Sequence, residues 1–153
     1  DMEGSRGLGD VYKRQSLGSD VEVMSPKRHD RVMAITSHLP HLIAYNIVST
    51  AADLENVTKS DIIKYSASGF RDFTRIASSD PTMWRDIFLN NKEAVLEMIS
   101  RFTEDLTALQ KSIRWEDGKS LHKLFSKTRK VRDKIISAGQ DTVDADFGRL
   151  KKR

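Results

Sequence analysis

The chain has 153 residues, 38% hydrophobic and 31% charged, with a formal net charge of +4, a composition typical of one globular domain with a real core. It contains no cysteine, which excludes disulfides, thiolate metal sites and a cysteine nucleophile, and favours a reducing, cytoplasmic location. It has no run of about 18 apolar residues and no signal-peptide pattern, so we expect no membrane partner.

The amino-terminal stretch shows no apolar periodicity. We therefore expect residues 1–17 to be a disordered leader outside the folded domain. Its glycines, Gly4, Gly7 and Gly9, occur in the reverse order of the dinucleotide-binding fingerprint and follow no predicted strand, so they predict no cofactor loop. The apolar alternation of residues 21–24 predicts one isolated β-strand within the segment 18–24.

Ser25 and Pro26 are a favourable N-cap and first helical position, and they begin a long helical pattern that extends to about Glu55. Pro40 lies inside this pattern. It cannot donate to the Thr36 carbonyl, so we expect the helix to bend or open there. The freed carbonyl would lie beside two histidines. The bend itself would then be either one wall of a ligand site or a simple packing kink.

Residues 60–78 predict one or two short helices, interrupted at Gly69. Asp80 and Pro81 then predict the cap of a second long helix that runs to about Trp115 and ends before Gly118. Two helices of roughly 30 residues would each be about 45 Å long, longer than a small domain is wide. We therefore expect part of their apolar surface to meet a second copy of the chain.

A final helix is predicted over about residues 119–138, with Gly139 at its carboxyl-terminal cap and a flexible tail over 140–153. Its basic residues recur every three or four positions, which is typical of an amphipathic helix with a solvated face, although a polyanion site is the alternative. These residues are Lys119, Lys123, Lys127, Lys130 and Lys134. The fold class is therefore all-α, a long-helix bundle over 25–139 with one vestigial strand.

Two histidines on the bent helix are the first candidate site residues. His38 and His41 are three residues apart and share a helix face, the spacing of a zinc pair. His29 would lie on the opposite face, and the sequence offers no clear third ligand, so we expect no metal. Contact with a substrate and a purely structural role remain open for both.

The second candidate group lies in residues 69–75. Arg71 and Arg75 are four residues apart, and Asp72 lies one helical turn from Arg75 and is positioned to hold its guanidinium. Two guanidinium groups on one surface suit a ligand with two carboxylates. Neighbouring aromatic residues, including Trp84, favour a partly buried anion site over an ordinary surface charge cluster.

These segments resemble the carboxyl-terminal half of prephenate and arogenate dehydrogenases. The resemblance rests on Ser37-His38-Leu39-Pro40-His41, on Gly69-Phe70-Arg71-Asp72-Phe73-Thr74-Arg75 and on Met83-Trp84-Arg85-Asp86. It covers about residues 18–139. The segment 18–24 would then be the remnant of the last strand of a nucleotide-binding domain.

The resemblance implies an oxidoreductase of tyrosine and aromatic amino acid biosynthesis. Such enzymes decarboxylate prephenate or arogenate oxidatively, with NAD or NADP as cofactor, and dimerise through their helical domains. It implies that Arg75 binds a substrate carboxylate, that Arg71 and Asp72 line or order the same wall, that His41 and His38 contact ligand, and that Trp84 supports the site.

The catalytic histidine of the family precedes a proline in the nucleotide-binding domain, whereas Pro40-His41 has the opposite order, so we expect no catalytic residue here. The chain also has no G-x-G-x-x-G loop. We therefore expect a fragment that retains substrate-binding and dimer surfaces, requires a nucleotide-binding domain in cis, and binds no cofactor and is inactive alone. The alternative is a stand-alone helical module for nucleic acid or protein interaction.

Overall fold

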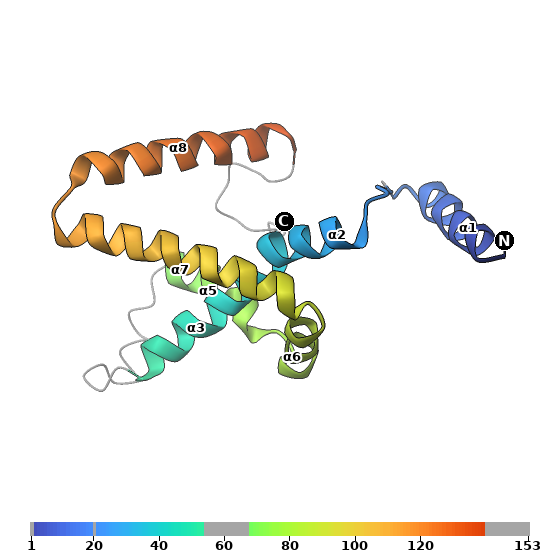
Figure 1. Ribbon diagram of the computed structural model, residues 1–153, viewed down its shortest axis with the longest axis horizontal. Helices are drawn as coiled ribbons and strands as arrows, with labels where there is room; N and C mark the ends of the chain where they lie inside the picture. Colours follow the sequence, from blue (N-terminus) through green and yellow to red (C-terminus); the bar gives the residue numbers. More distant parts are fainter. Residues whose placement is uncertain (1, 20, 54–67, 140–153) are drawn as a thin grey trace, which may run out of the picture.

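The computed structural model describes residues 2–19, 21–53 and 68–139, and these residues form helices and loops without a strand (Figure 1). The predicted all-α class is therefore confirmed, and the predicted strand is wrong. Residues 21–24 are irregular, because no described segment lies beside them to pair with their backbone groups. The predicted tail over 140–153 lies outside the described residues.

The leader differs from its prediction as well. Residues Met2–Ser16 form helix α1, which Figure 1 shows apart from the other helices. Arg14 Nε lies 2.9 Å from Asp10 Oδ2, an ion pair one helical turn apart, and Lys13 and Arg14 lie in the last turn, where positive charge favours a helix. These local interactions favour a helix in α1. The lack of apolar periodicity, on which the prediction of disorder was based, does not report them.

The first long helical pattern forms as three consecutive helical segments. Helix α2 (Pro26–Met33) begins at Ser25, whose side chain accepts a hydrogen bond from the Arg28 backbone N–H. A π-helical turn, η1 (Ala34–His38), follows, and α3 (Leu39–Asp53) continues from it. The Leu39 N–H donates to the Ala34 carbonyl, five residues back, so the disturbance expected at Pro40 takes the form of a π-helical turn just before the proline.

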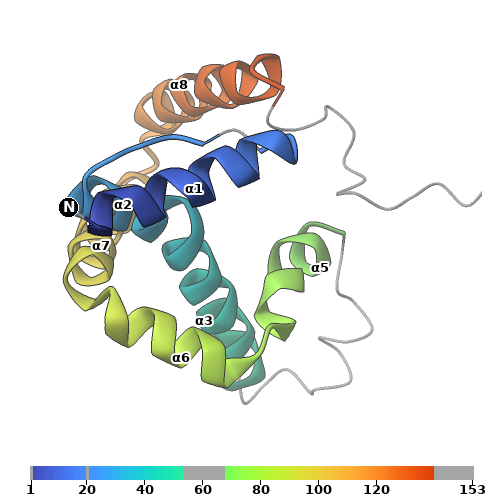
Figure 2. The same ribbon diagram turned by 90° about the vertical axis from the view of Figure 1, so that its right-hand side faces the viewer.

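The short helical region is partly described. Helix α5 (Ser68–Thr74) contains Gly69 in its first turn, so Gly69 does not interrupt it, and residues before 68 lie outside the described part of the chain. A 3₁₀ turn, η2 (Arg75–Ser78), follows directly. Both α5 and η2 pack against α3, as Figure 2 shows for α5.

The second long helix is broken in two. Helix α6 (Pro81–Asn90) and helix α7 (Lys92–Arg114) meet at Asn91, where the backbone leaves helical geometry and the chain changes direction (Figure 2). The predicted single helix is therefore wrong in its middle and right at both ends. The apolar residues continue across Asn91 with helical spacing, so periodicity alone did not reveal the corner.

The start of α6 carries the cap that the sequence predicted. The Asp80 carboxylate accepts a hydrogen bond of 2.7 Å from the Met83 backbone N–H, and Pro81 occupies the first turn. We expect Asp80→Ala to lower the free energy of unfolding by about 1 kcal/mol, because it leaves this donor without its cap. Urea unfolding followed by circular dichroism measures the change. Asp80→Asn keeps a capping oxygen, and a loss as large as that of alanine would contradict the cap as the cause.

The buried core lies where α7 crosses η1 and the start of α3. Small residues, Ala34 and Ala94, allow the two helical segments to approach closely, and larger side chains fill the space around them. The cluster consists of Ala34, Leu39, Ala94, Val95 and Met98, with Ile43, Phe88, Ile99 and Phe102 packed against it. An ion-pair group in which Glu97 accepts from both Arg31 and Arg101 joins α2 to α7 at the edge of this core.

Helices α7 and α8 (Gly118–Ser137) form an antiparallel hairpin (Figure 1). Glu116, with φ of 54°, makes the turn after α7, and the Asp117 N–H donates to the Ser112 carbonyl, the pattern of a Schellman cap. Gly118 is therefore the first residue of α8, and Asp117 is the N-cap of that helix. The break between the two helices, expected at Gly118, lies just before this residue. Gly139, with φ of 71°, follows the end of α8 as predicted.

Large apolar side chains of this hairpin are in contact with solvent. Their exposed fractions reach 64% for Ile113, 72% for Trp115 and 55% for Phe125, and Leu106, Leu124, Val131 and Ile135 belong to the same set. We call these seven residues the hairpin apolar face. The basic side chains of α8, Lys119, Lys123, Lys127, Lys130 and Lys134, are also exposed, as expected for a solvated face.

Candidate functional site

The π-helical turn, the start of α3 and α6 bring three of the predicted site residues together. The rings of His41 and Trp84 stack with their centroids 3.6 Å apart, and the His38 ring meets the same indole edge-on at 6.2 Å. Phe88, one turn along α6, also contacts the indole, with the two ring centroids 5.5 Å apart. Trp84 is only 6% exposed, so its indole is part of the buried interior.

The polar atoms of this cluster are specifically placed. His41 Nδ1 lies 2.8 Å from the Ser37 carbonyl oxygen, within the same helical segment. A carbonyl oxygen only accepts, so His41 carries its proton on Nδ1 and its Nε2 is left with a lone pair when the ring is neutral. The indole Nε1 of Trp84 is buried and has no hydrogen-bond partner among the described residues.

The environment of His38 disfavours its charged form. Burial lowers the pKa of His38 below its ordinary value of 6.5, and His41 and His29 lower it further by repulsion, while the nearby Asp30 opposes them. Asn91, at the corner between α6 and α7, contacts the ring: its Nδ2 lies 3.2 Å from His38 Nδ1. His38 is therefore held as a neutral imidazole near neutral pH.

This shift predicts a pH dependence of stability. Because the unfolded chain binds the His38 proton more tightly than the folded chain, the free energy of unfolding falls as pH drops below about 6.5. We expect urea unfolding to show a smaller difference between about pH 8 and about pH 5.5 in His38→Gln than in the wild type. His122→Gln, at an exposed histidine of α8 that is not among the groups acting on His38, should retain the wild-type difference. Equal pH dependence in all three proteins would contradict this assignment.

The arginines lie on a neighbouring surface. Arg71 and Arg75 belong to α5 and η2, which pack against α3, the helix that carries His41. Both side chains are exposed, so the partial burial that the neighbouring aromatic residues predicted for these arginines is wrong. Phe73, one of those aromatic residues, is itself 44% exposed. Within the described part of the chain neither arginine forms an ion pair. The predicted pairing of Asp72 with Arg75 is therefore absent there. Arg75 begins a 3₁₀ turn, so the α-helical spacing on which that pairing relied ends at Thr74.

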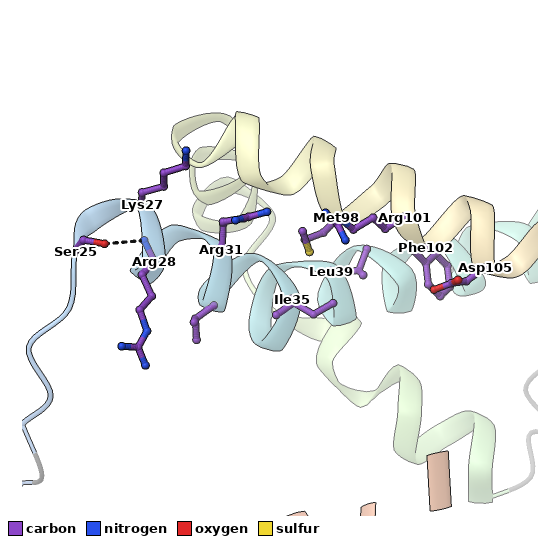
Figure 3. A pocket seen from close by; sticks show the side chains of 11 residues that line it. Ser25, Lys27, Arg28, Arg31, Ile35, Leu39, Met98, Arg101, Phe102 and Asp105 are labelled. Carbon is purple, nitrogen blue, oxygen red and sulfur yellow. Dashed lines mark hydrogen bonds between the residues drawn. The ribbon is translucent and has the colours of Figure 1, made fainter. Parts of the chain in front are cut away.

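Two grooves in the described residues lie elsewhere. The larger, of about 750 Å³, runs between α2, η1 and α7 and has an apolar floor that includes Ile35, Leu39 and Phe102 (Figure 3). Lys27, Arg28, Arg31 and Arg101 give it a basic rim, with Asp105 at one end. The second, of about 620 Å³, adjoins it across Arg31 and is lined by Asn91 and Glu97 among others. Neither groove is lined by His38, His41, Arg71, Asp72, Arg75 or Trp84.

One residue that contacts the histidine and tryptophan cluster was not predicted from the sequence. Asn91 was missed, although the polar pair Asn90-Asn91 inside an otherwise apolar pattern is a signal that could have indicated it. The same described residues contain no group of three or more histidine, aspartate or glutamate side chains arranged to hold a metal ion. Over those residues, no helix is long and apolar enough to cross a membrane.

Residues 25–127, more than half of the chain, match the family of the prephenate dehydrogenase dimerization domain. The chain belongs to this family. Two curated relatives agree with the assignment: the cyclohexadienyl dehydrogenase of Zymomonas mobilis is 40% identical over 118 residues, and the prephenate dehydrogenase of Bacillus subtilis is 37% identical over 124. These alignments cover 77% and 81% of this chain but only 40% and 33% of the relatives.

Solved structures show the same relationship for the dimerization domain. The prephenate dehydrogenase of A. aeolicus, in complex with hydroxyphenyl propionate and NAD+, superposes with a TM-score of 0.77 at 40% identity, covering 88% of this chain and 46% of that one. The arogenate dehydrogenase of Synechocystis gives a TM-score of 0.75 at 26% identity, with 88% and 48% covered. The chain thus spans less than half the length of these relatives, and the resemblance found in its sequence is confirmed.

Proposed function

We propose that this chain provides the substrate-binding and dimerisation part of a prephenate or arogenate dehydrogenase, in which it acts together with a nucleotide-binding domain. The observation that carries the proposal is the cluster of His38, His41 and Trp84, beside a surface that carries two unpaired arginines. The family supports the reaction class, an NAD- or NADP-dependent oxidative decarboxylation in tyrosine biosynthesis.

The chemistry of the substrate fits the groups that this chain offers. Prephenate and arogenate each carry two carboxylates, and a guanidinium binds a carboxylate through two parallel hydrogen bonds. Arg75 would bind one carboxylate, Arg71 and Asp72 would line the same wall, His41 and His38 would contact the ring substituents, and Trp84 would hold both imidazoles in place. The exposure of Arg71 and Arg75 leaves both guanidinium groups available for such a ligand.

The sequence offers no residues that fit the nicotinamide cofactor. It contains no G-x-G-x-x-G loop, and its glycines near the amino terminus lie in or near α1 rather than between a strand and a helix. We infer that cofactor binding and the removal of the hydroxyl proton belong to a nucleotide-binding domain, and that this chain alone transfers no hydride. A second function, a stand-alone module for nucleic acid or protein binding, gains no support from the comparisons.

We also propose that two copies associate through the hairpin apolar face, which gives a homodimer. A solvent-exposed set of this size, which includes Trp115 and Phe125, is larger than scattered surface residues would explain. The family to which the chain belongs is named for a dimerization domain, which supports association of two copies.

Binding of a product-like acid tests the proposed site. We expect 3-(4-hydroxyphenyl)propionate to bind the 153-residue chain and to shift the NMR signals of the Trp84 indole and the His41 ring. Arg75→Ala should weaken the affinity by at least about tenfold, because it removes a charge-assisted hydrogen bond. Arg85→Ala is the matched control, since Arg85 is an exposed arginine of α6 that pairs with Asp86.

Equal affinity in the wild type and Arg75→Ala would contradict the assigned role of Arg75, and the absence of binding would overturn the site. A spectrophotometric assay with prephenate and NAD+ completes the test. Reduction of NAD+ above the uncatalysed background by this chain alone would contradict the division of labour between the two domains.

A further inference from the structure

Asn91 occupies the corner between α6 and α7, where it links three parts of the fold. Its side chain is half-buried, and its Nδ2 lies 2.9 Å from the Asp30 carbonyl oxygen of α2 and 3.2 Å from His38 Nδ1 in η1. The side chain does not cap α7, because it accepts no hydrogen bond from the first backbone N–H groups of that helix. Its hydrogen bonds are therefore directed to the helix that carries the two histidines.

The partners of Asn91 determine which atom of its amide faces them. A backbone carbonyl only accepts hydrogen bonds, so the atom beside the Asp30 carbonyl has to be the amide nitrogen. That nitrogen carries two hydrogens, and the second is available to His38 Nδ1. An Nδ1 that accepts a hydrogen bond carries no proton, so the single ring proton of neutral His38 lies on Nε2.

His41 shows the opposite arrangement. Its Nδ1 donates to the Ser37 carbonyl, so its Nε2 has a lone pair and no proton. Both rings contact the same indole, one stacked and one edge-on. The two histidines thus differ at Nε2, where His38 is a hydrogen-bond donor and His41 is an acceptor.

We propose that Asn91 is a positioning residue that fixes the tautomer and orientation of His38, so that the two histidines form a donor and acceptor pair for the ligand of this site. The inference rests on the proposed function. His38 would donate to a carboxylate or carbonyl oxygen, and His41 would accept from a hydroxyl or ammonium group. A ligand that carries both kinds of group is oriented by such a pair, whereas two identical imidazoles would not distinguish its two ends.

Three ionisable groups act on the protonation of His38, and their effects oppose one another. From α2, Asp30 favours the protonated ring and His29 opposes it, and from α3, His41 opposes it as well. Asn91 and Trp84, which approach from the α6–α7 side, are uncharged. A carboxylate at position 91 would therefore be a new charge directly against Nδ1.

Substitution of Asn91 by aspartate tests the proposal on the 153-residue chain. Long-range ¹H–¹⁵N NMR spectra identify the protonated nitrogen of each histidine, and single His→Gln variants assign the signals. We expect the wild type to show His38 protonated on Nε2. In Asn91→Asp the proton should move to Nδ1 and the pKa of His38 should rise, because the carboxylate accepts and is negatively charged. Because the Asn91 side chain makes no cap hydrogen bond to α7, the substitution removes no cap from that helix.

Asn90→Asp is the matched control, because it introduces the same charge one residue away from position 91. Asn90 is exposed, and its side chain donates a hydrogen bond to the Asp86 carbonyl rather than to His38. This substitution should leave the His38 tautomer unchanged. A wild-type His38 protonated on Nδ1 would overturn the proposal, and this result requires no variant to fold. The same tautomer in Asn91→Asp as in the wild type would overturn it as well.

Titration with 3-(4-hydroxyphenyl)propionate separates this inference from the proposed function. We expect Asn91→Asp to bind at least about tenfold more weakly than Asn90→Asp, because the His38 donor has been lost and a negative charge added. Equal affinities would overturn the positioning role while leaving the ligand site in place. If the wild type binds no ligand, the proposed function fails, although the tautomer spectra still decide whether Asn91 controls His38.

Discussion

Replacement of Trp84 by alanine is expected to lower the free energy of unfolding by about 3–5 kcal/mol, the range for deletion of a large buried aromatic side chain. Trp84 is 6% exposed and contacts His38, His41 and Phe88, so its loss would leave a cavity between η1 and α6. Urea unfolding followed by circular dichroism measures the loss. This is the largest single effect on stability that the described residues indicate.

The control for Trp84 lies on the same helix. Leu89 is 66% exposed, and Leu89→Ala should change the free energy of unfolding by about 0.5 kcal/mol or less. Trp84→Phe keeps a ring against His41 and should recover much of the loss. A loss in Trp84→Ala no greater than that in Leu89→Ala would show that the aromatic cluster does not support this part of the fold.

The double substitution Phe125→Asp and Val131→Asp is expected to convert the proposed dimer into a monomer. Both residues belong to the hairpin apolar face and are more than half exposed in one copy of the chain. Two carboxylates placed in an apolar interface would lose their hydration without a partner, which costs several kcal/mol and raises the dissociation constant by at least about 100-fold. Light scattering coupled to gel filtration would then report the monomer mass of 17.4 kDa rather than twice that value.

The basic side of the same helix provides the comparison. Lys123→Asp with Lys130→Asp introduces the same two side chains at exposed positions of α8 that are neither three nor four residues from a member of the hairpin apolar face. We expect that protein to remain dimeric. A dimer that survives the first pair of substitutions, or a wild type that is monomeric at about 100 μM, would show that the contact lies elsewhere or does not form.

Local chemistry made much of the fold predictable. Ser25, Asp80 and Gly139 are all at the helix boundaries that their capping preferences indicated, and Pro40 disturbs the helix close to where it was expected to do so. These features depend on interactions within one turn of the chain. The family resemblance could also be found from the sequence, since it rests on three short segments that occur in the same order along the chain.

Features that depend on tertiary contacts were not predictable in the same way. The corner at Asn91 is stabilised by hydrogen bonds to residues more than 50 positions earlier, which periodicity does not report. The strand predicted in residues 21–24 has the alternation of a strand but lacks a neighbour to pair with. For the site, the aromatic residues near Arg71 and Arg75 predicted partial burial, whereas both side chains are exposed. How far α5 and η2 are covered depends on their packing against α3, which their own residues do not specify.

The hairpin apolar face also affects how the stability of this chain is to be measured. In the proposed dimer, large side chains such as Trp115 and Ile113 would be covered only on association, and part of the free energy that maintains the fold would be supplied by a second molecule. By mass action, the melting temperature then rises with protein concentration, and dilution alone destabilises the chain. A stability value for this protein therefore describes a sequence at a stated concentration, and variants are comparable only when that concentration is held the same.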